Sequence, residues 1–155
     1  MCNPLYIANN VIHRSKESGY PLTHMKLQKI LYFIYRAYIQ KSKENMPLFS
    51  ERFAVWKYGP VLESVYNAFK QYGSDNITDY YIENGKAYGA NEEKNQLLHE
   101  VLDNVWEKCK GLTGIQLSNI THKKDSAWYN AYQNDLFFLD DEDIKEDRVP
   151  LDICN

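Results

Sequence analysis

Histidine and carboxylate side chains at helical spacing are the first candidates for chemistry in this sequence. His99 and Glu100 are followed by Asp103 one helical turn later, in an arrangement loosely like that of a metal-binding helix. The second histidine that such a helix carries four residues after the first is absent. We therefore interpret these side chains as a solvated helix face and predict no metal site.

A further histidine, His122, follows Thr121 at the predicted end of a helix and precedes Lys123 and Lys124. Because a helix C-terminus favours positive charge, an imidazole here is a candidate proton donor or acceptor. The alternative is a structural role, in which a hydrogen-bonded Thr-His pair forms a turn against Trp128. The sequence favours the structural role and leaves proton transfer open.

The familiar catalytic signatures are missing from the chain. It has no GxSxG, GxxxxGK[ST], GxGxxG or HExxH pattern. Its three cysteines, Cys2, Cys109 and Cys154, are far apart without CxxC spacing, so we expect reduced thiols rather than disulfides or zinc ligands. A dyad between Cys109 and a distant histidine is an open alternative. We predict no catalytic residue, no metal and no cofactor, and hence a protein that is not an enzyme.

The composition is that of one globular domain. The chain has 155 residues, of which 44% are hydrophobic and 25% charged, and a chain of this length can fold without disulfides or metals. No apolar run is long enough for a transmembrane span, and residues 1–4 do not resemble a signal peptide. We therefore expect a cytoplasmic protein with no membrane partner.

Charge divides unevenly along the chain. Residues 1–73 hold ten Lys/Arg against four Asp/Glu, a net charge of +6, whereas residues 74–155 hold eight against seventeen, a net charge of −9. Nucleic-acid binding usually needs a basic excess, so there is no strong case for a nucleic-acid partner. The chain has thirteen tyrosines, a residue enriched in protein interfaces. A tyrosine-rich chain whose two halves carry opposite net charge favours binding to a protein partner of complementary charge.

The elements that must position these residues are mainly helices. Asn3 and Pro4 are typical of a helix start, and Gly19 of its end. A short extended stretch at residues 53–56 breaks at Gly59-Pro60, a sharp strand-to-helix turn from which another helix is expected to run to Gly73.

A second helix is predicted from its cap, Thr23, to about Lys41. Its apolar surface is wide enough to contact neighbours on two sides, so we expect this helix to be central, with Lys26 and Lys29 off the apolar stripe. The stripe consists of Leu27, Ile30, Leu31, Ile34 and Tyr38.

The second half of the chain contains one hairpin signal and several helices. Asn84-Gly85 joins residues 80–83 to residues 86–88, a strong hairpin pattern that must pack on helices to be stable. Helices are predicted over about residues 91–109, from the capping box Thr113–Gln116 to near His122, and through Trp128 and Tyr132. The predicted fold is mainly α: a compact single domain of five to seven helices with a small β hairpin, at the margin of α+β.

Three segments, taken in order, resemble those of a known family. Lys26–Phe33 reads KLQKILYF, Trp56–Val61 reads WKYGPV, and Leu117–His122 reads LSNITH with Trp128 after it. They are similar to the KLQKLLYF, W-x-YGPV and LS-x-x-TH-x(5)-W segments of the Panacea domain, also called the SocA-like or GepA-like antitoxin domain. The resemblance covers about residues 4–135. The motif residues that carry it are Lys26, Leu27, Gln28, Trp56, Tyr58, Gly59, Pro60, Thr121, His122 and Trp128.

The resemblance implies an antitoxin of a bacterial or prophage toxin–antitoxin system that neutralises a cognate protein toxin by direct binding. The alternatives are a proteolytic adaptor that delivers the toxin to the ClpXP protease, and a phage-encoded anti-defence protein that binds a host protein. We assign residues 1–139 to the antitoxin domain and residues 140–155 to an acidic C-terminal tail. Because one domain type handles unrelated toxins, we place partner binding outside the motifs, at hairpin tyrosines and acidic residues. These are Tyr80, Tyr81, Tyr88, Asp140, Asp141, Glu142 and Asp143.

Overall fold

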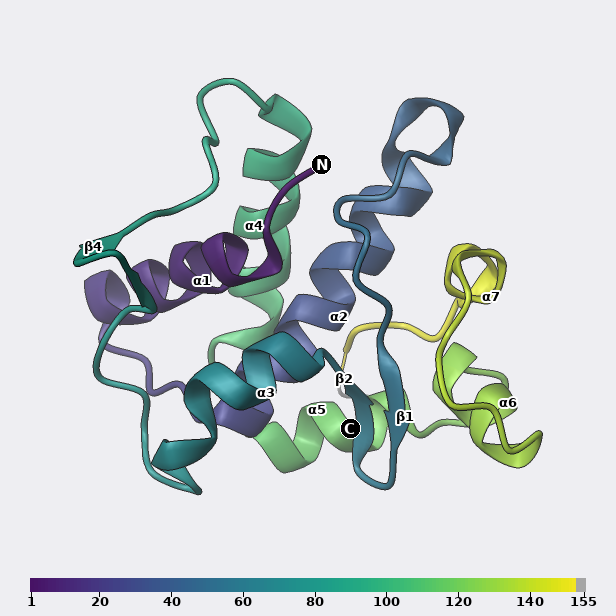
Figure 1. Ribbon diagram of the computed structural model, residues 1–155. Helices are drawn as coiled ribbons and strands as arrows, with labels where there is room; N and C mark the ends of the chain where they lie inside the picture. Colours follow the sequence, from purple (N-terminus) through teal and green to yellow (C-terminus); the bar gives the residue numbers. More distant parts are fainter. Residues whose placement is uncertain (153–155) are drawn as a thin grey trace.

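Helices make up most of the structure. The computed structural model describes residues 1–152, whose elements are, in chain order, α1 (Pro4–Ser18), α2 (His24–Lys41), η1 (Lys43–Asn45), β1 (Ala54–Trp56), β2 (Gly59–Val61), α3 (Glu63–Phe69), η2 (Lys70–Tyr72), β3 (Ile82–Glu83), β4 (Lys86–Ala87), α4 (Gln96–Cys109), α5 (Gly114–Thr121), α6 (Ala127–Gln133) and α7 (Asp141–Glu146). The elements η1 and η2 are single 3₁₀ turns. The predicted mainly α fold is confirmed, with two antiparallel hairpins, β1–β2 and β3–β4, where one was expected (Figure 1).

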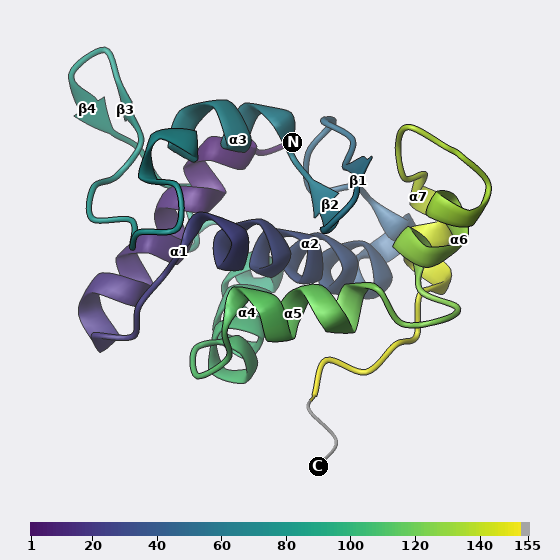
Figure 2. The ribbon, with the colours of Figure 1, turned by 90° about the horizontal axis from the view of Figure 1, so that it is seen from below.

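Helix α2 is the centre of the fold, and α1, α3, α4, α5 and α7 all pack on it (Figures 1 and 2). Leu27, Ile30 and Leu31 are fully buried, as the wide apolar stripe predicts. Lys26 and Lys29, which lie off this stripe, are buried as well, with only 4% and 2% of their surface exposed. Helical periodicity does not reveal this burial, because α2 has neighbours on most sides. These neighbours supply backbone carbonyl partners to both ammonium groups.

The predicted helix caps are confirmed. Asn3 and Thr23 accept hydrogen bonds from backbone N–H groups in the first turns of α1 and α2. Gly19 ends α1 in the left-handed conformation, with φ of 78°. The capping box at Thr113 and Gln116 is present at the start of α5.

Helix α4 begins later than predicted. It starts at Gln96, with the side chain of Asn95 as its cap, rather than near residue 91. The residues before it bend towards α1, where Glu92 forms an ion pair with Arg14. The apolar pattern alone does not reveal this bend, because it depends on a charge 78 residues earlier in the chain.

Gly59–Val61 form strand β2, where the sequence predicts a helix start at Pro60. Strand β2 pairs antiparallel with β1, and α3 begins only at Glu63. The reason lies in α2, where the Gln28 side chain accepts from the Leu62 N–H (2.9 Å) and donates to the Leu62 carbonyl (3.1 Å). Both backbone groups of Leu62 are thereby paired in an extended conformation, which delays the helix.

The β3–β4 hairpin forms at the predicted turn and packs on α1. Asn84 and Gly85 both adopt positive φ values, 51° and 80°, as this two-residue turn requires. Asn9 on α1 holds the hairpin: its carboxamide donates to the carbonyls of Tyr81 (3.0 Å) and Tyr88 (2.9 Å) and accepts from the Tyr81 N–H (2.7 Å). A helix side chain thus replaces the neighbouring strand that the short hairpin lacks.

The acidic segment is a helix packed onto the domain. Asp140 caps α7, Ile144 is buried, and the buried carboxylate of Asp147 accepts from the Tyr32 hydroxyl (2.7 Å) and from Arg36 (3.2 Å). The segment predicted as a tail is therefore folded onto α2 and α6 as far as residue 147. The division of the chain at residue 140 stays a prediction.

Two of the three cysteines belong to the described residues. Cys2 is half-buried and Cys109 is buried, and both are free thiols; Cys154 lies outside the described residues. Between residues 1 and 152, no helix has both the length and the hydropathy needed to cross a membrane.

Candidate functional site

The three motif segments meet beside the β1–β2 hairpin. The Lys29 ammonium donates to the Pro60 carbonyl over 3.0 Å. A Cβ atom on Gly59 would lie 2.8 Å from Oγ1 of Thr121 and 2.9 Å from Cε of Lys29, and the φ of Gly59 is 116°. Only glycine readily fits both this space and this conformation. We call these four residues, Lys29, Gly59, Pro60 and Thr121, the motif junction.

The remaining motif contacts hold the same hairpin from another side. Ser118 on α5 donates its hydroxyl to the Tyr58 carbonyl (2.6 Å), and the Trp128 indole on α6 donates to the Trp56 carbonyl (2.8 Å). Together with the bond from Lys29, side chains of three helices pair carbonyls along the hairpin. The motif residues therefore fix the position of β1–β2 against α2, α5 and α6.

Lys29 is a buried cation without a carboxylate partner in the part of the chain that the structure describes. Burial lowers the pKa of its ammonium group to about 7, because a charged amine is poorly solvated there. The imidazoles of His24 and His122 face the same charge, and their pKa values are lowered first by burial and then by Lys29. The motif junction therefore favours the uncharged forms of all three groups.

His122 forms the end of α5 and packs against aromatic rings. Its ring centroid lies 4.0 Å from that of Trp128, which in turn stacks on Tyr132 at 4.6 Å. Its Nε2 atom is buried and makes no hydrogen bond within residues 1–152. These contacts agree with a structural turn against Trp128, but the expected Thr-His hydrogen bond does not form within residues 1–152, because the Thr121 hydroxyl donates to the Ser118 carbonyl (2.7 Å). The described residues bring no partner for proton transfer to the imidazole.

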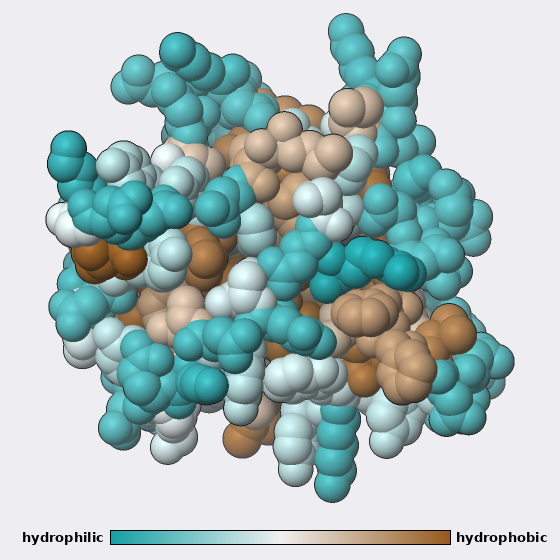
Figure 3. Space-filling model, in the orientation of Figure 1, coloured by the Kyte–Doolittle hydropathy of each residue, from teal (hydrophilic) through white to brown (hydrophobic). Residues whose placement is uncertain are grey.

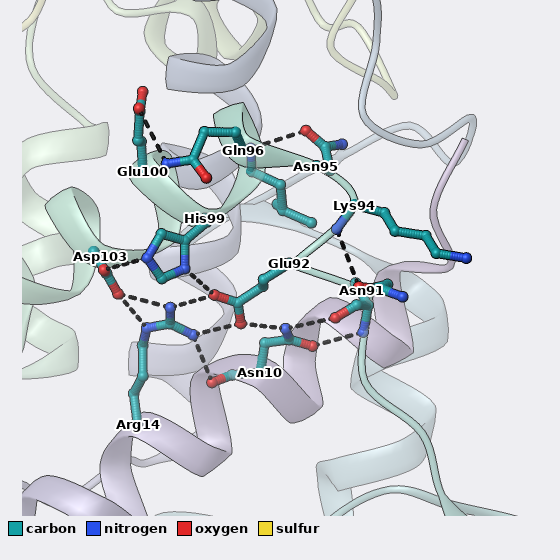
Figure 4. Close-up of polar contacts among 12 residues, drawn as sticks. Asn10, Arg14, Asn91, Glu92, Lys94, Asn95, Gln96, His99, Glu100 and Asp103 are labelled. Atoms are coloured by element: carbon teal, nitrogen blue, oxygen red, sulfur yellow. Dashed lines mark hydrogen bonds and ion pairs between the residues drawn. The ribbon is translucent and has the colours of Figure 1, made fainter.

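A second polar cluster joins α1 to the start of α4 (Figure 4). Arg14 contacts Glu92 at 2.6 Å and Asp103 at 2.7 Å, while His99 contacts the same two carboxylates at 2.9 and 3.2 Å. Burial opposes ionisation of Glu92, but hydrogen bonds from Arg14, Asn10 and His99 outweigh it and lower the pKa of this carboxyl to about 2.

This cluster could be mistaken for a metal centre. Ligand atoms of Glu92, His99 and Asp103 lie within 4.8 Å of one another. The guanidinium of Arg14 lies against both carboxylates, however, and already supplies the positive charge that a metal ion would bring. We interpret the cluster as a structural link between α1 and α4, which differs from the solvated face that the sequence suggests.

The predicted partner-binding residues form two separate groups. The β3–β4 hairpin lies beside α1 at one end of the molecule, and α7 lies at the other end (Figures 1 and 2). Tyr80 and Tyr81 are partly buried against the core, whereas Tyr88 is exposed. The side chains of residues 140–143 are exposed. The structure does not bring the tyrosines and the acidic residues together.

Sequence reasoning missed three exposed apolar side chains between α6 and α7. Leu136, Phe137 and Phe138 are 47%, 84% and 39% exposed, and Figure 3 shows hydrophobic side chains gathered over this part of the molecule. The available signal was an apolar run between Asp135 and Asp140, in a stretch otherwise rich in polar residues. We call Leu136–Phe138 the apolar segment.

Replacing Gly59 should damage the fold even with the smallest side chain. We expect Gly59→Ala to lower the free energy of unfolding by at least about 2 kcal/mol, because the new methyl group meets Thr121 and the backbone is strained. Lys86→Ala, at an exposed hairpin position, is the control. Urea denaturation measures both, and equal stabilities would show that the motif junction tolerates a side chain.

Burial of Lys29 predicts a dependence of stability on pH. Its pKa is lower in the folded chain than in the unfolded chain, so between pH 7 and about pH 10 the unfolded chain binds more protons, and stability rises with pH. Between pH 7 and 9 the wild-type chain should gain about 2 kcal/mol relative to Lys29→Met. Denaturation of both proteins at pH 7, 8 and 9 tests this; a constant difference would mean that Lys29 titrates normally.

Comparison with known proteins supports the family resemblance that the motif segments carry. The family model described as "Antitoxin SocA-like, Panacea domain" matches residues 27–129, a range that includes the whole motif junction. The antitoxin SocA of Caulobacter vibrioides (strain NA1000 / CB15N) is 27% identical over 126 residues, which cover 79% of this chain and 66% of that protein. No solved structure matches the chain significantly. The chain therefore belongs to the SocA-like Panacea antitoxin family.

Proposed function

We propose that this protein is the antitoxin of a toxin–antitoxin system and neutralises a cognate protein toxin in the cytoplasm by direct binding. The observation that carries this proposal is the family match across residues 27–129. The curated relative is named an antitoxin, which supports the same role.

Binding by contact needs an outer surface rather than an active site. The motif side chains Gln28, Lys29, Ser118 and Trp128 are engaged with the backbone of the chain itself. Exposed apolar side chains also lie outside the motifs, where the apolar segment is the clearest example, while Trp56 and Tyr58 of the motif are themselves 37% and 60% exposed. The backbone bonds of these four motif side chains support a division in which they fix the fold and other side chains contact the toxin.

The proposed mechanism is stoichiometric and involves no catalysis. One antitoxin covers one toxin through an interface of roughly 1,200–2,000 Å². His122 has the strongest claim to acid–base chemistry, but its described contacts are with aromatic rings. We retain Tyr88, at one end of the molecule, and the exposed acidic residues 140–143, at the other end, as two separate groups of proposed contacts.

Titration of toxin activity distinguishes contact from catalysis. The adjacent open reading frame is first co-expressed with this chain, and rescue of growth identifies the toxin. Increasing amounts of purified wild type or His122→Asn are then added to that toxin. We expect a break near one equivalent with both proteins. Full protection at a small fraction of an equivalent, lost in folded His122→Asn, would instead indicate an enzyme.

A further inference from the structure

The apolar segment continues the β1–β2 hairpin as a third extended strand. The Val55 N–H donates to the Phe137 carbonyl (2.9 Å), the Leu139 N–H donates to the Phe53 carbonyl (2.9 Å), and Phe138 pairs antiparallel with Ala54. Residues 137–139 therefore lie on the side of β1 opposite to β2. The order of strands across this small sheet is β2, β1 and residues 137–139.

The two outer edges of this sheet differ. Strand β2 is covered, because its edge contacts α2 and α5 and the Pro60 carbonyl is bound by Lys29. At the other edge, the carbonyl of Phe137 and the N–H of Leu139 point towards β1. Because backbone groups alternate in direction along a strand, the N–H and C=O of Phe138, between them, point away from the sheet. Neither group of Phe138 has a hydrogen-bond partner within residues 1–152. This edge is open to another extended chain.

The side chains around the open edge are apolar and acidic. Phe137 is the most exposed aromatic residue among those described, and Leu136 and Phe138 extend its surface. One cation, Arg52, lies over the Phe138 ring and donates to the Leu139 carbonyl. The exposed carboxylates that flank the segment are those of Asp135, Asp140, Asp141, Glu142 and Asp143.

Negative charge therefore exceeds positive charge at this edge. Among the carboxylates, Glu142 is paired with Lys145 at 2.7 Å. Burial, and then the neighbouring carboxylates of Asp140, Glu146 and Glu142, raise the pKa of Asp143. A polypeptide segment that carries lysine or arginine beside apolar residues would therefore be attracted electrostatically to this edge.

We propose that the open edge at Phe138 binds an extended segment of the partner protein, in which basic and apolar residues alternate, as an added β-strand. Main-chain hydrogen bonds to Phe138 would supply affinity, while the apolar segment and the flanking carboxylates would supply specificity. This inference rests on the proposed function, because it identifies the kind of toxin segment that the antitoxin recognises.

Two variants of Phe138 separate the backbone contribution from that of the side chain. Phe138→Pro removes the outward N–H, while the bonds to β1, made by Phe137 and Leu139, are retained. Phe138→Ala removes the aromatic ring but keeps the N–H, and is the matched control. Thermal unfolding verifies that both variants fold.

Peptide binding is the direct test. The probes are two fluorescein-labelled peptides of twelve residues, one alternating valine with lysine and the other valine with glutamate, followed by fluorescence anisotropy. We expect the lysine peptide to bind at least tenfold more tightly than the glutamate peptide, and Phe138→Pro to bind it at least fivefold more weakly than Phe138→Ala. Equal affinities for the two peptides, absence of binding, or equal affinities of the two variants would overturn the proposal.

Further variants keep the test valid if Phe138→Pro does not fold. Phe137→Ser alters a side chain that is largely in solvent, and Glu142→Gln with Asp143→Asn removes two charges without touching the cap at Asp140. Each should weaken binding of the lysine peptide at least threefold, and the charge variant should lose less at high salt. Unchanged binding in both would overturn the proposal.

Growth rescue separates this inference from the proposed function. If the wild-type chain fails to neutralise the product of the adjacent gene, the antitoxin role is contradicted. The peptide affinities then still test whether the edge at Phe138 binds a β-strand. If all variants neutralise that toxin as well as wild type does, and all bind the lysine peptide equally, the antitoxin role stands. The proposal that the edge at Phe138 binds the toxin is then overturned.

Discussion

Buried polar side chains of α1 and α2 pair the backbone of the segments that connect the helices, and the rest of the structure depends on this pairing. Helices satisfy their own backbone groups, but the connections at residues 54–62 and 81–90 lie against helices without a full sheet to bond to. Gln28 pairs both backbone groups of Leu62, Lys29 binds the Pro60 carbonyl, and Asn9 binds Tyr81. Since an unpaired buried amide or carbonyl costs about 1–3 kcal/mol, each of these side chains decides where a loop can lie.

The same backbone pairing engages the motif side chains whose types could do chemistry. A lysine, a threonine, a histidine and a tryptophan converge on one hairpin, yet Lys29 and Trp128 donate to backbone carbonyls, and His122 packs against a ring. These bonds fix the shape of the core, and the apolar segment lies outside it. That arrangement agrees with the partner contact that we propose.

The local signals in the sequence predicted most of the helices and the Asn84-Gly85 hairpin, because caps, turn residues and apolar periodicity act over a few residues. The misses all arise from contacts between distant parts of the chain. Periodicity placed Lys29 off the apolar stripe and did not reveal its burial, which a carbonyl 31 residues later makes possible. Pro60 suggested a helix start, but Gln28 holds the next segment extended. The acidic composition that suggested a tail over residues 140–155 does not reveal how residues 140–147 pack, because Asp147 pairs with Tyr32 and Arg36, more than a hundred residues earlier, and with the Ala127 N–H.

The free energy of unfolding of Gln28→Met tests most directly whether backbone pairing by α2 holds the fold. Methionine keeps the length and burial of the side chain but can pair neither group of Leu62, whereas Gln133→Met, at an exposed helix position, is the matched control. Measured by urea denaturation, Gln28→Met should lose about 1–3 kcal/mol, because the buried N–H of Leu62 loses its partner while the Leu62 carbonyl keeps only its bond from the Tyr66 N–H. A loss within about 0.5 kcal/mol of the control would contradict the central role of this pairing.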